Sequence, residues 1–437
     1  MKTQPPKGRS QLTSKQLLAH VATLHSKDID LGLERFRVLL ARLGNPQDHL
    51  PPVIHVAGTN GKGSTIAYLR SIFEAVGYSV HAFTSPHLIS THDSILLKGE
   101  AVSEEELAGL LDEVITANDG DGLTVFEAVT AAAFLGFSRH SAHVVLLETG
   151  MGGLGDTTNV VEKPALSVLT PISKDHTEFL GDSLAKIAAQ KAGILKKGVP
   201  CVMAAQEKEA YQVVRERTKA LGVPVYREGR DWFVKRVGQR MVFEGWDGDY
   251  AWPLPGLEGE HQINNAGLAL ACLEVLKNDF NLPHEAVGNG LQSVHWAGRL
   301  ERIPSGDLLP KGWELWLDGG HNEAAAKMLR QQMKKWRDKP LYVVFGMLKR
   351  KDSKAFIHEI ADRADHIYTV SIPAQESKKP QKLAERIERE GGHATVCEDL
   401  THAFETIRAE HTDKSARVLV CGSLYLLSAF YELHANA

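Results

Sequence analysis

A glycine-rich stretch early in the chain has the residues of a phosphate-binding loop. It reads AGTNGKGST over residues 57–65 and stands between the short apolar run VIHVAG and a helical stretch. A loop of this kind presents backbone N–H groups and a helix N-terminus to phosphate oxygens, and Lys62 is placed to reach the terminal phosphates. The alternative is a turn without function, which the strand before it, the lysine and the helix after it all disfavour. We expect ATP, the simplest ligand, to bind the residues of this loop: Gly58, Thr59, Asn60, Gly61, Lys62, Gly63 and Ser64.

The residue after Lys62 departs from the usual pattern of such loops. Gly63 stands where a serine or threonine commonly offers a hydroxyl to Mg²⁺, and Ser64 is one residue late. Another oxygen ligand is therefore needed, and ligands of open α/β sheets collect at the C-terminal ends of the strands. Each candidate alone is a weak signal, because such a serine is usually a turn residue and such a glutamate a solvated charge, and a histidine is unexpected for a hard cation. Their shared position after successive strand-like runs is what favours a site formed by Ser85, Glu148 and His176.

Strand-like and helical runs alternate around these residues. The runs VIHVAG, HVVLLETG and ALSVLTPI are short, rich in β-branched residues and bounded by glycine or polar clusters, as expected for buried parallel strands. Helical stretches such as FEAVTAAAFLGF and SLAKIAAQKAGILKK separate them. The alternation predicts a parallel sheet with helices on both faces.

The same pattern restarts in the last third of the chain. Four strand-like runs, WELWLDGG, LYVVFGM, HIYTVSI and RVLVCGS, are separated by helical stretches and predict a second, smaller doubly wound unit. Residues 202–255 are more polar, and we expect a strand-rich excursion with loops there, before the helical HQINNAGLALACLEVL. The joint falls in HWAGRLE, so we predict domains at 1–297 and 298–437. A length of 437 residues agrees with two domains of unequal size.

Composition excludes several classes of protein. The net charge of −4 and the absence of a long lysine or arginine run disfavour a nucleic-acid partner. The start MKTQPPKGRSQL has no apolar core behind its charges, and no run approaches membrane-spanning length, so we expect a cytoplasmic protein without a membrane partner. Nothing indicates a coiled coil or an exposed apolar interface, so we expect a monomer. Four cysteines without CxxC spacing indicate reduced thiols: Cys201, Cys272, Cys397 and Cys421.

Eight short motifs together resemble one family. They are GTNGKGS, TSPH, ETGMGG, DHTEFLG, KAGI, HQINNA, GRLE and DGGHN, and they look like folylpolyglutamate synthase, within the wider Mur ligase superfamily. They occur in the family's order and cover nearly the whole chain. The segment LHSKDIDLGLER at residues 24–35 is similar to that of bacterial enzymes that combine dihydrofolate synthase with folylpolyglutamate synthase activity. The resemblance implies a Mur-ligase-like α/β fold: a P-loop nucleotide-binding central domain with a mainly parallel sheet, plus a smaller Rossmann-like C-terminal domain.

The resemblance also implies a reaction and a set of site residues. The reaction is ATP-dependent amide formation between L-glutamate and dihydropteroate, tetrahydrofolate or its polyglutamates, through an acyl phosphate. Two Mg²⁺ ions are implied, the first on Ser85 and Glu148, the second held or flanked by Glu148, His176 and a carbamylated Lys191. Without the resemblance, Lys191 reads as a solvated surface charge. Three further positions match ATP contacts of the family: Asn265, Arg299 and Asp318.

A linker salt bridge is the alternative role for Arg299. The catalytic residues that we expect from the motifs are Lys62, Lys191, His176, Asp318 and His321.

The acceptor pocket is expected from two matches. Residues Asp30, Leu31 and Gly32 match a dihydropteroate-contacting loop of the family. Phe126 and Glu127 match an aromatic and acidic pair whose ring could stack on a flat pterin, the alternative being that Phe126 is a core residue.

Some positions depart from the family pattern. The chain reads GGLGDTTN where the family usually has GGRLDATN, so Leu154 and Gly155 replace an arginine and a leucine while Asp156 is retained. Leucine cannot replace the bidentate contacts of an arginine. Two alternatives therefore remain: a related ligase with a different pterin-like or carboxylate acceptor, and a nucleotide-binding protein without activity. No requirement of the fold demands the six retained polar residues, which disfavours the inactive alternative: Lys62, Ser85, Glu148, His176, Lys191 and Asp318.

Overall fold

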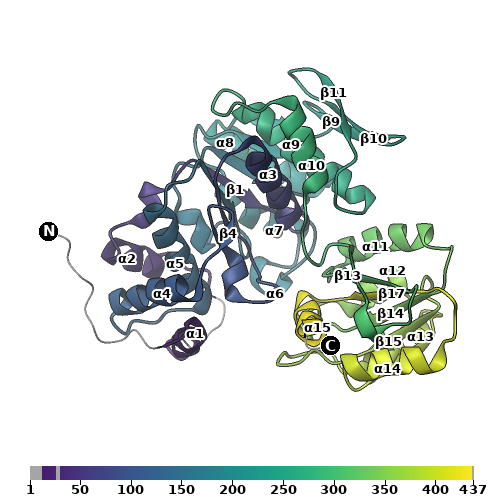
Figure 1. Ribbon diagram of the computed structural model, residues 1–437. Helices are drawn as coiled ribbons and strands as arrows, with labels where there is room; N and C mark the ends of the chain where they lie inside the picture. Colours follow the sequence, from purple (N-terminus) through teal and green to yellow (C-terminus); the bar gives the residue numbers. More distant parts are fainter. Residues whose placement is uncertain (1–11, 26–29, 436–437) are drawn as a thin grey trace.

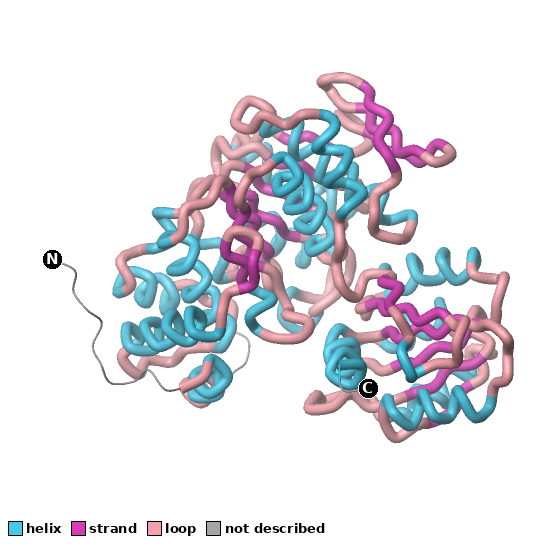
Figure 2. The backbone as a smooth tube through the Cα atoms, in the orientation of Figure 1, coloured by secondary structure: helices cyan, strands magenta, loops and turns pink. Residues whose placement is uncertain are grey.

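The computed structural model describes residues 12–25 and 30–435, and their elements form two units, each built around its own sheet (Figure 1). The first unit contains the elements from α1 to α10, and the second contains those from β12 to α15. Figure 2 shows the main sheet of each unit with helices on both sides. Within the described residues, no helix combines the length and apolar character needed to cross a membrane.

The sheet of the first unit is mainly parallel, as predicted. Its strands lie in the order β4-β3-β2-β5-β1-β6-β7-β8, and only β3 and β4 run antiparallel to their neighbours. The central strand β1 pairs Ile54 with Leu146 of β5 on one side and with Leu166 of β6 on the other. The strands are β1 (Val53–Ala57), β2 (Val80–Phe83), β3 (Ile95–Leu97), β4 (Glu100–Ala101), β5 (Val144–Glu148), β6 (Leu166–Leu169), β7 (Cys201–Met203) and β8 (Val225–Arg227).

Alternate residues of β1 face two different sets of helices. Ile54 and Val56 pack in the cluster formed by α3 (Lys62–Val76), α9 (Glu260–Leu276) and α10 (His284–Ser293). Residues on the opposite face, such as Val53 and Ala57, pack against the remaining helices of the unit. Burial of both faces explains why the parallel strands read as continuous apolar runs. The opposite face is covered mainly by α1 (Ser14–Val21), α2 (Glu34–Arg42), α4 (Glu104–Asn118), α5 (Val125–Arg139), α7 (Leu184–Lys191) and α8 (Lys208–Leu221).

The excursion at residues 202–255 is only partly as predicted. It contains the expected strands, including an antiparallel three-stranded sheet that packs on the α9 side of the unit. It also contains the helix α8, which the sequence pattern does not predict. The reason is that its buried positions are few and set four residues apart, so the apolar stripe is narrow: Ala210, Val214 and Thr218. The three strands are β9 (Phe233–Val237), β10 (Arg240–Glu244) and β11 (Asp249–Pro253).

The second unit is a smaller doubly wound sheet, as predicted. Its order is β12-β13-β17-β14-β15-β16, and all neighbours except β12 and β13 are parallel. One face is covered by α11 (Glu323–Lys335), α12 (Ser353–Ile360) and α13 (Pro380–Arg389), the other by α14 (Leu400–Glu410) and α15 (Leu424–Ala435). The strands are β12 (Glu301–Ile303), β13 (Glu314–Asp318), β14 (Leu341–Phe345), β15 (His366–Thr369), β16 (Ala394–Val396) and β17 (Arg417–Cys421).

The helix α15 lies on the side of the second unit that faces the first (Figure 1). Leu88 of the first unit packs against the apolar cluster that contains Leu426 and Leu427 of α15. The domain boundary between residues 297 and 298 stays a prediction.

Candidate active site between the two units

The glycine-rich stretch forms a loop between β1 and α3. Gly61 caps the helix in the left-handed region, with a φ of 89°, and a Cβ there would lie 2.6 Å from Asn265 Oδ1. Lys62 begins the helix, and its Nζ lies 3.4 Å from the Thr59 carbonyl oxygen and 3.8 Å from Glu148 Oε1. The loop therefore has the geometry of a phosphate cradle, with Asn265 and Glu148 close beside it.

A tryptophan explains why the loop carries glycine after its lysine. A Cβ on Gly63 would lie 2.9 Å from Nε1 of Trp296 and 3.0 Å from Cζ2 of the same indole. A serine or threonine at position 63 would therefore displace this ring. The packing of Trp296 against Gly63 therefore disfavours the usual hydroxyl at this position.

Two serines differ in whether their hydroxyls are already bound. Ser64 Oγ is buried and accepts a hydrogen bond from Gln262 Nε2 at 3.4 Å. Ser85 Oγ is buried and has no hydrogen-bond partner among the described residues. The backbone N–H of Ser85 donates to Glu148 Oε2 at 3.4 Å, so this free hydroxyl stands beside the carboxylate that ends β5.

The charged groups behind the loop are strongly affected by burial. Burial raises the pKa of Glu148, against the opposing charge of Lys62. Burial, together with the charge of Lys62, lowers the pKa of Lys191 to about 7. The Lys191 Nζ donates to the Gly58 carbonyl oxygen at 2.7 Å, so its amine lies directly behind the phosphate-binding loop.

His176 takes an unusual backbone conformation at the edge of the same site. Its φ is 51°, it precedes the short helix α6 (Thr177–Leu180), and its buried Nδ1 has no partner among the described residues. Burial and the charge of Lys351 lower the pKa of His176 to about 3, so the ring is neutral and able to act as a ligand. Within the described ranges, no three His, Cys, Asp or Glu side chains are grouped as a metal site. The expected ligand set thus depends on the Ser85 hydroxyl and on modification of Lys191.

Asp318 and Arg299 lie where the two units join. Asp318 accepts hydrogen bonds from the backbone N–H of Leu300 at 3.0 Å and from that of Gly320 at 2.8 Å. Each of its two carboxylate oxygens is therefore bonded to the backbone. The Arg299 guanidinium packs on Gly319, where a Cβ would meet Nη1 at 2.8 Å. In the described part of the chain Arg299 forms no ion pair, which removes the linker salt bridge as its role.

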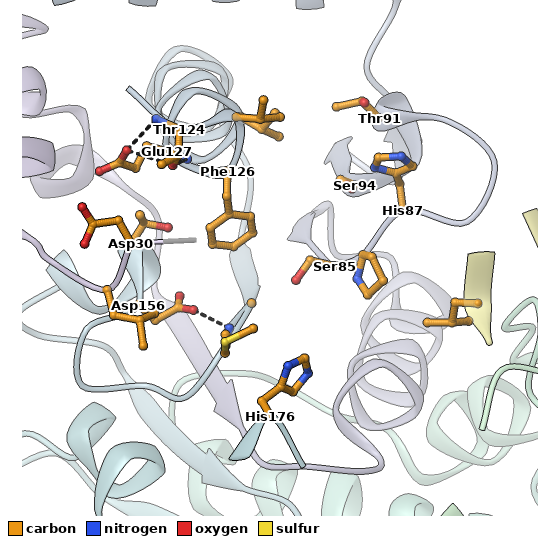
Figure 3. A pocket seen from close by; sticks show the side chains of 18 of the residues that line it. Asp30, Ser85, His87, Thr91, Ser94, Thr124, Phe126, Glu127, Asp156 and His176 are labelled. Atoms are coloured by element: carbon orange, nitrogen blue, oxygen red, sulfur yellow. Dashed lines mark hydrogen bonds between the residues drawn. The ribbon is translucent and has the colours of Figure 1, made fainter. Parts of the chain in front are cut away.

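A cavity of about 520 Å³ opens between the units and is lined by residues of both (Figure 3). The Phe126 ring points into it, so this aromatic is not simply a core residue. Five of the six expected acceptor residues line the cavity, and Gly32 does not: Asp30, Leu31, Phe126, Glu127 and Asp156. Ser85, His176 and His321 line it as well. The cavity therefore joins these five acceptor residues to two of the four candidate metal ligands, whereas Glu148 and Lys191 do not line it.

Two of the three acidic residues of the acceptor side, Glu127 and Asp156, are already hydrogen-bonded within the protein. Glu127 accepts hydrogen bonds from Arg35 Nη2 at 2.8 Å and from the Thr124 backbone N–H at 2.8 Å. Asp156 accepts a hydrogen bond from the Met151 backbone N–H at 2.7 Å, and burial raises the pKa of the Asp156 carboxyl. Both carboxylates therefore line the cavity and also fix neighbouring parts of its wall through these hydrogen bonds.

Several residues of the site were not predicted from the sequence. Asp175 accepts contacts from three side chains of the second unit, and Lys351 is the nearest, with Nζ 2.5 Å from Asp175 Oδ1. Burial opposes ionisation of Asp175, but a hydrogen bond from His321 and the charge of Lys351 hold the pKa of this carboxyl well below its ordinary value. Asp175 stands next to His176 in the DHTEFLG motif, which was the available signal. Lys351, in the charge-rich LKRKD, reads as a solvated residue.

Comparison with known proteins decides which family this site belongs to. The Mur ligase middle domain family matches residues 56–273, and the family described as Mur ligase, glutamate ligase domain matches residues 298–424. The dihydrofolate synthase/folylpolyglutamate synthase of Bacillus subtilis is 34% identical over 414 residues, covering 91% of this chain and 93% of that protein. The chain belongs to the folylpolyglutamate synthase/dihydrofolate synthase family. The Escherichia coli enzyme of the same description is 30% identical over 430 residues, covering 98% of this chain and 96% of that protein.

Solved structures of this family have the same fold. The structure of E. coli FolC in complex with DHPP and ADP aligns with a TM-score of 0.89 at 28% identity, over 98% of this chain and 99% of that one. The bifunctional enzyme of Yersinia pestis complexed with AMPPNP and Mn aligns with a TM-score of 0.87 at 28% identity, over 98% and 100% of the two chains. The expected Mur-ligase-like fold is confirmed. As a member of the folylpolyglutamate synthase/dihydrofolate synthase family, the protein is an ATP-dependent glutamate ligase.

The main departure from the family pattern lies at the edge of the site. The side chain of Leu154 is 51% exposed and does not line the cavity. Gly155 does line it, and a Cβ there would lie 2.3 Å from the Leu31 carbonyl oxygen. The loop at residues 30–32 thus occupies the space that a leucine at position 155 would need.

Proposed function

We propose that this protein adds L-glutamate to dihydropteroate and to tetrahydrofolate or its polyglutamates, through an acyl phosphate. The observation that carries the proposal is the cavity that runs from the Phe126 ring to Ser85 and His176. Ser85 contacts Glu148, which lies 3.8 Å from Lys62 of the phosphate-binding loop. A flat pterin stacked on Phe126 would direct its carboxylate tail towards that loop. The names of the relatives from B. subtilis and E. coli support the same substrates.

ATP and Mg²⁺ are the cofactors of this proposal. The donor set fits a divalent cation, because it offers an unpaired buried hydroxyl on Ser85, a buried carboxylate on Glu148 and an unpaired buried Nδ1 on His176. AMPPNP and Mn in a relative support the same kind of ligand. When bound, two Mg²⁺ ions would neutralise charge on the transferring phosphoryl group.

Lys191 is proposed to carry a carbamate that completes the metal site. Carbamylation requires a neutral amine, which attacks CO₂ at carbon and loses a proton. A pKa lowered to about 7 by burial makes that neutral form abundant near neutral pH. The modification would convert the cation behind Gly58 into an anionic oxygen ligand.

The proposed reaction has two steps. A carboxylate oxygen of the acceptor attacks the γ-phosphorus of ATP, ADP leaves, and Lys62 stabilises the charge on the transferring group. The neutral amine of L-glutamate then attacks the carbonyl of the acyl phosphate, the amide forms, and phosphate departs with the oxygen that the acceptor supplied. Asn265, Arg299, Asp318 and His321 are proposed to complete the nucleotide and reaction site from the junction of the two units.

Several expectations from the sequence remain part of the proposal. They are the domain boundary at residues 297 and 298, the acceptor contact of Gly32, the monomeric state and the cytoplasmic location.

The path of the carboxylate oxygen tests the proposed function. The purified protein would be given ATP, Mg²⁺, L-glutamate and dihydropteroate labelled with ¹⁸O in its carboxylate. We expect dihydrofolate as the product and one ¹⁸O atom in each phosphate released. Dihydrofolate formed with unlabelled phosphate would refute the acyl phosphate, and absence of dihydrofolate would refute dihydropteroate as the acceptor.

A further inference from the structure

A single carboxylate of the first unit contacts three side chains of the second unit. Asp175 lies between β6 and α6, and its Oδ1 accepts the backbone N–H of His176 at 2.8 Å. The same Oδ1 lies 2.5 Å from Lys351 Nζ. Its Oδ2 lies 3.3 Å from His321 Nε2 and accepts Asn322 Nδ2 at 3.2 Å.

The three partners come from two separate loops of the second unit. His321 and Asn322 follow β13, and Lys351 follows β14. Asn322 also exchanges amide hydrogen bonds with Asn60 of the phosphate-binding loop, at 3.0 and 3.2 Å. Asp175 therefore stands at the point where two loops of one unit meet the nucleotide loop of the other.

Burial distinguishes this contact from another ion pair between the units. The Lys351 and Asp175 side chains are only 8% and 9% exposed, so water screens their attraction little. Lys335 and Glu260 also pair across the units, at 2.6 Å, but are 49% and 40% exposed. Loss of a buried partner leaves an uncompensated charge, whereas loss of an exposed one has little effect.

We propose that Asp175 is a positioning residue that locks the two units together over the cavity and so protects the acyl phosphate from water. This inference rests on the proposed function for its chemical consequence. Lys351 and His321 line the cavity, so the group that fixes them also closes its side towards the second unit. The glycine-rich loop that would hold the phosphates belongs to the first unit. The lock should therefore affect the coupling of ATP use to amide formation more than nucleotide binding.

The first test compares variants of the full chain by the ratio of amide formed to phosphate released. Asp175→Asn keeps the size and one acceptor oxygen but removes the charge. We expect it to lower the ratio at least tenfold while the Kd for ADP changes less than threefold. Lys351→Met should give a similar loss, and the double variant should be no worse than either single one. The matched control, Lys335→Met, removes the exposed pair and should keep the wild-type ratio.

Equal ratios of amide to phosphate in Asp175→Asn and the wild type would overturn the proposal, as would losses that multiply in the double variant.

A second readout does not depend on the reaction. Spin labels on Glu216→Cys and Lys382→Cys, exposed positions on α8 and α13, would report the distance between the units by pulsed EPR.

We expect a narrow distance distribution in the wild type that broadens in Asp175→Asn and in Lys351→Met. An unchanged distribution in both variants would refute the lock. If the wild type makes no amide with either folate acceptor, the proposed function fails, and the EPR result still decides the lock. Should Asp175→Asn fail to fold, Lys351→Met decides it alone.

Discussion

The indole of Trp296 fills the space in which a side chain on Gly63 would stand, with Nε1 2.9 Å from the position of a Cβ. Gly63 lies in the first turn of α3, and packing against the linker that joins the two units thus restricts the residue at this position. The position after Lys62 offers no hydroxyl to a metal ion, whereas Ser85 has a buried, unpaired hydroxyl and contacts Glu148.

Gly63→Ser should destabilise the protein, because the new side chain must displace Trp296. We expect the free energy of unfolding to fall by about 1–3 kcal/mol, the usual cost of overpacking. Urea denaturation of the single variant would measure this fall. The same substitution made in Trp296→Ala should cost almost nothing, since the ring is gone. An equal cost in both backgrounds would show that the indole is not the obstacle.

Ser85→Ala should weaken the dependence of activity on Mg²⁺ more than Ser64→Ala does. The Ser85 hydroxyl is free to bind a cation, whereas the Ser64 hydroxyl already accepts a hydrogen bond from Gln262. Titration of the initial rate with Mg²⁺ should show at least a tenfold rise in the required concentration for Ser85→Ala and less than threefold for Ser64→Ala. The reverse order would contradict the assignment.

Lys191→Ala should remove at least 99% of the wild-type activity, because a metal ligand is lost. This loss corresponds to about 3 kcal/mol of transition-state stabilisation. Short carboxylic acids should restore part of the rate, because they can replace the carbamate oxygens. The matched control is Lys186→Ala, which removes a lysine of the same helix whose side chain is 64% exposed, and it should retain the wild-type rate. Full activity of Lys191→Ala would exclude the carbamate role.

His55 should make the folded protein sensitive to acid. It is fully buried in β1, and burial lowers its pKa from 6.5 to about 3. Between these two values the unfolded chain binds a proton that the folded chain does not, so stability falls as the pH drops from 6.5 towards 3. The slope from one such group reaches about 1.4 kcal/mol per pH unit. Urea unfolding at several pH values should show a flatter dependence for His55→Gln, and an identical dependence would contradict this origin.

The sequence was informative where structure and chemistry are both local. The phosphate-binding loop follows a buried strand and opens a helix, so one short stretch predicts its shape and its ligand. The parallel strands could be predicted because burial on both faces leaves continuous apolar runs.

Contacts between distant segments could not be predicted in this way. Asp175 and Lys351 lie 176 residues apart, and each reads as a solvated charge until the two units are brought together. The same holds for Trp296, whose contact with Gly63 depends on how the linker packs. Helix α8 was not predicted because its buried face consists of only three residues, set four positions apart.

Phosphate release from ATP with Mg²⁺ and L-glutamate, measured with dihydropteroate, with tetrahydrofolate and without an acceptor, tests the proposed function most directly. We predict that both acceptors stimulate release and that little occurs without them. Release with tetrahydrofolate alone would limit the enzyme to the polyglutamylating reaction. Bound ATP without stimulation by either acceptor would contradict the central claim and would direct attention to other carboxylate acceptors and to the departures at Leu154 and Gly155.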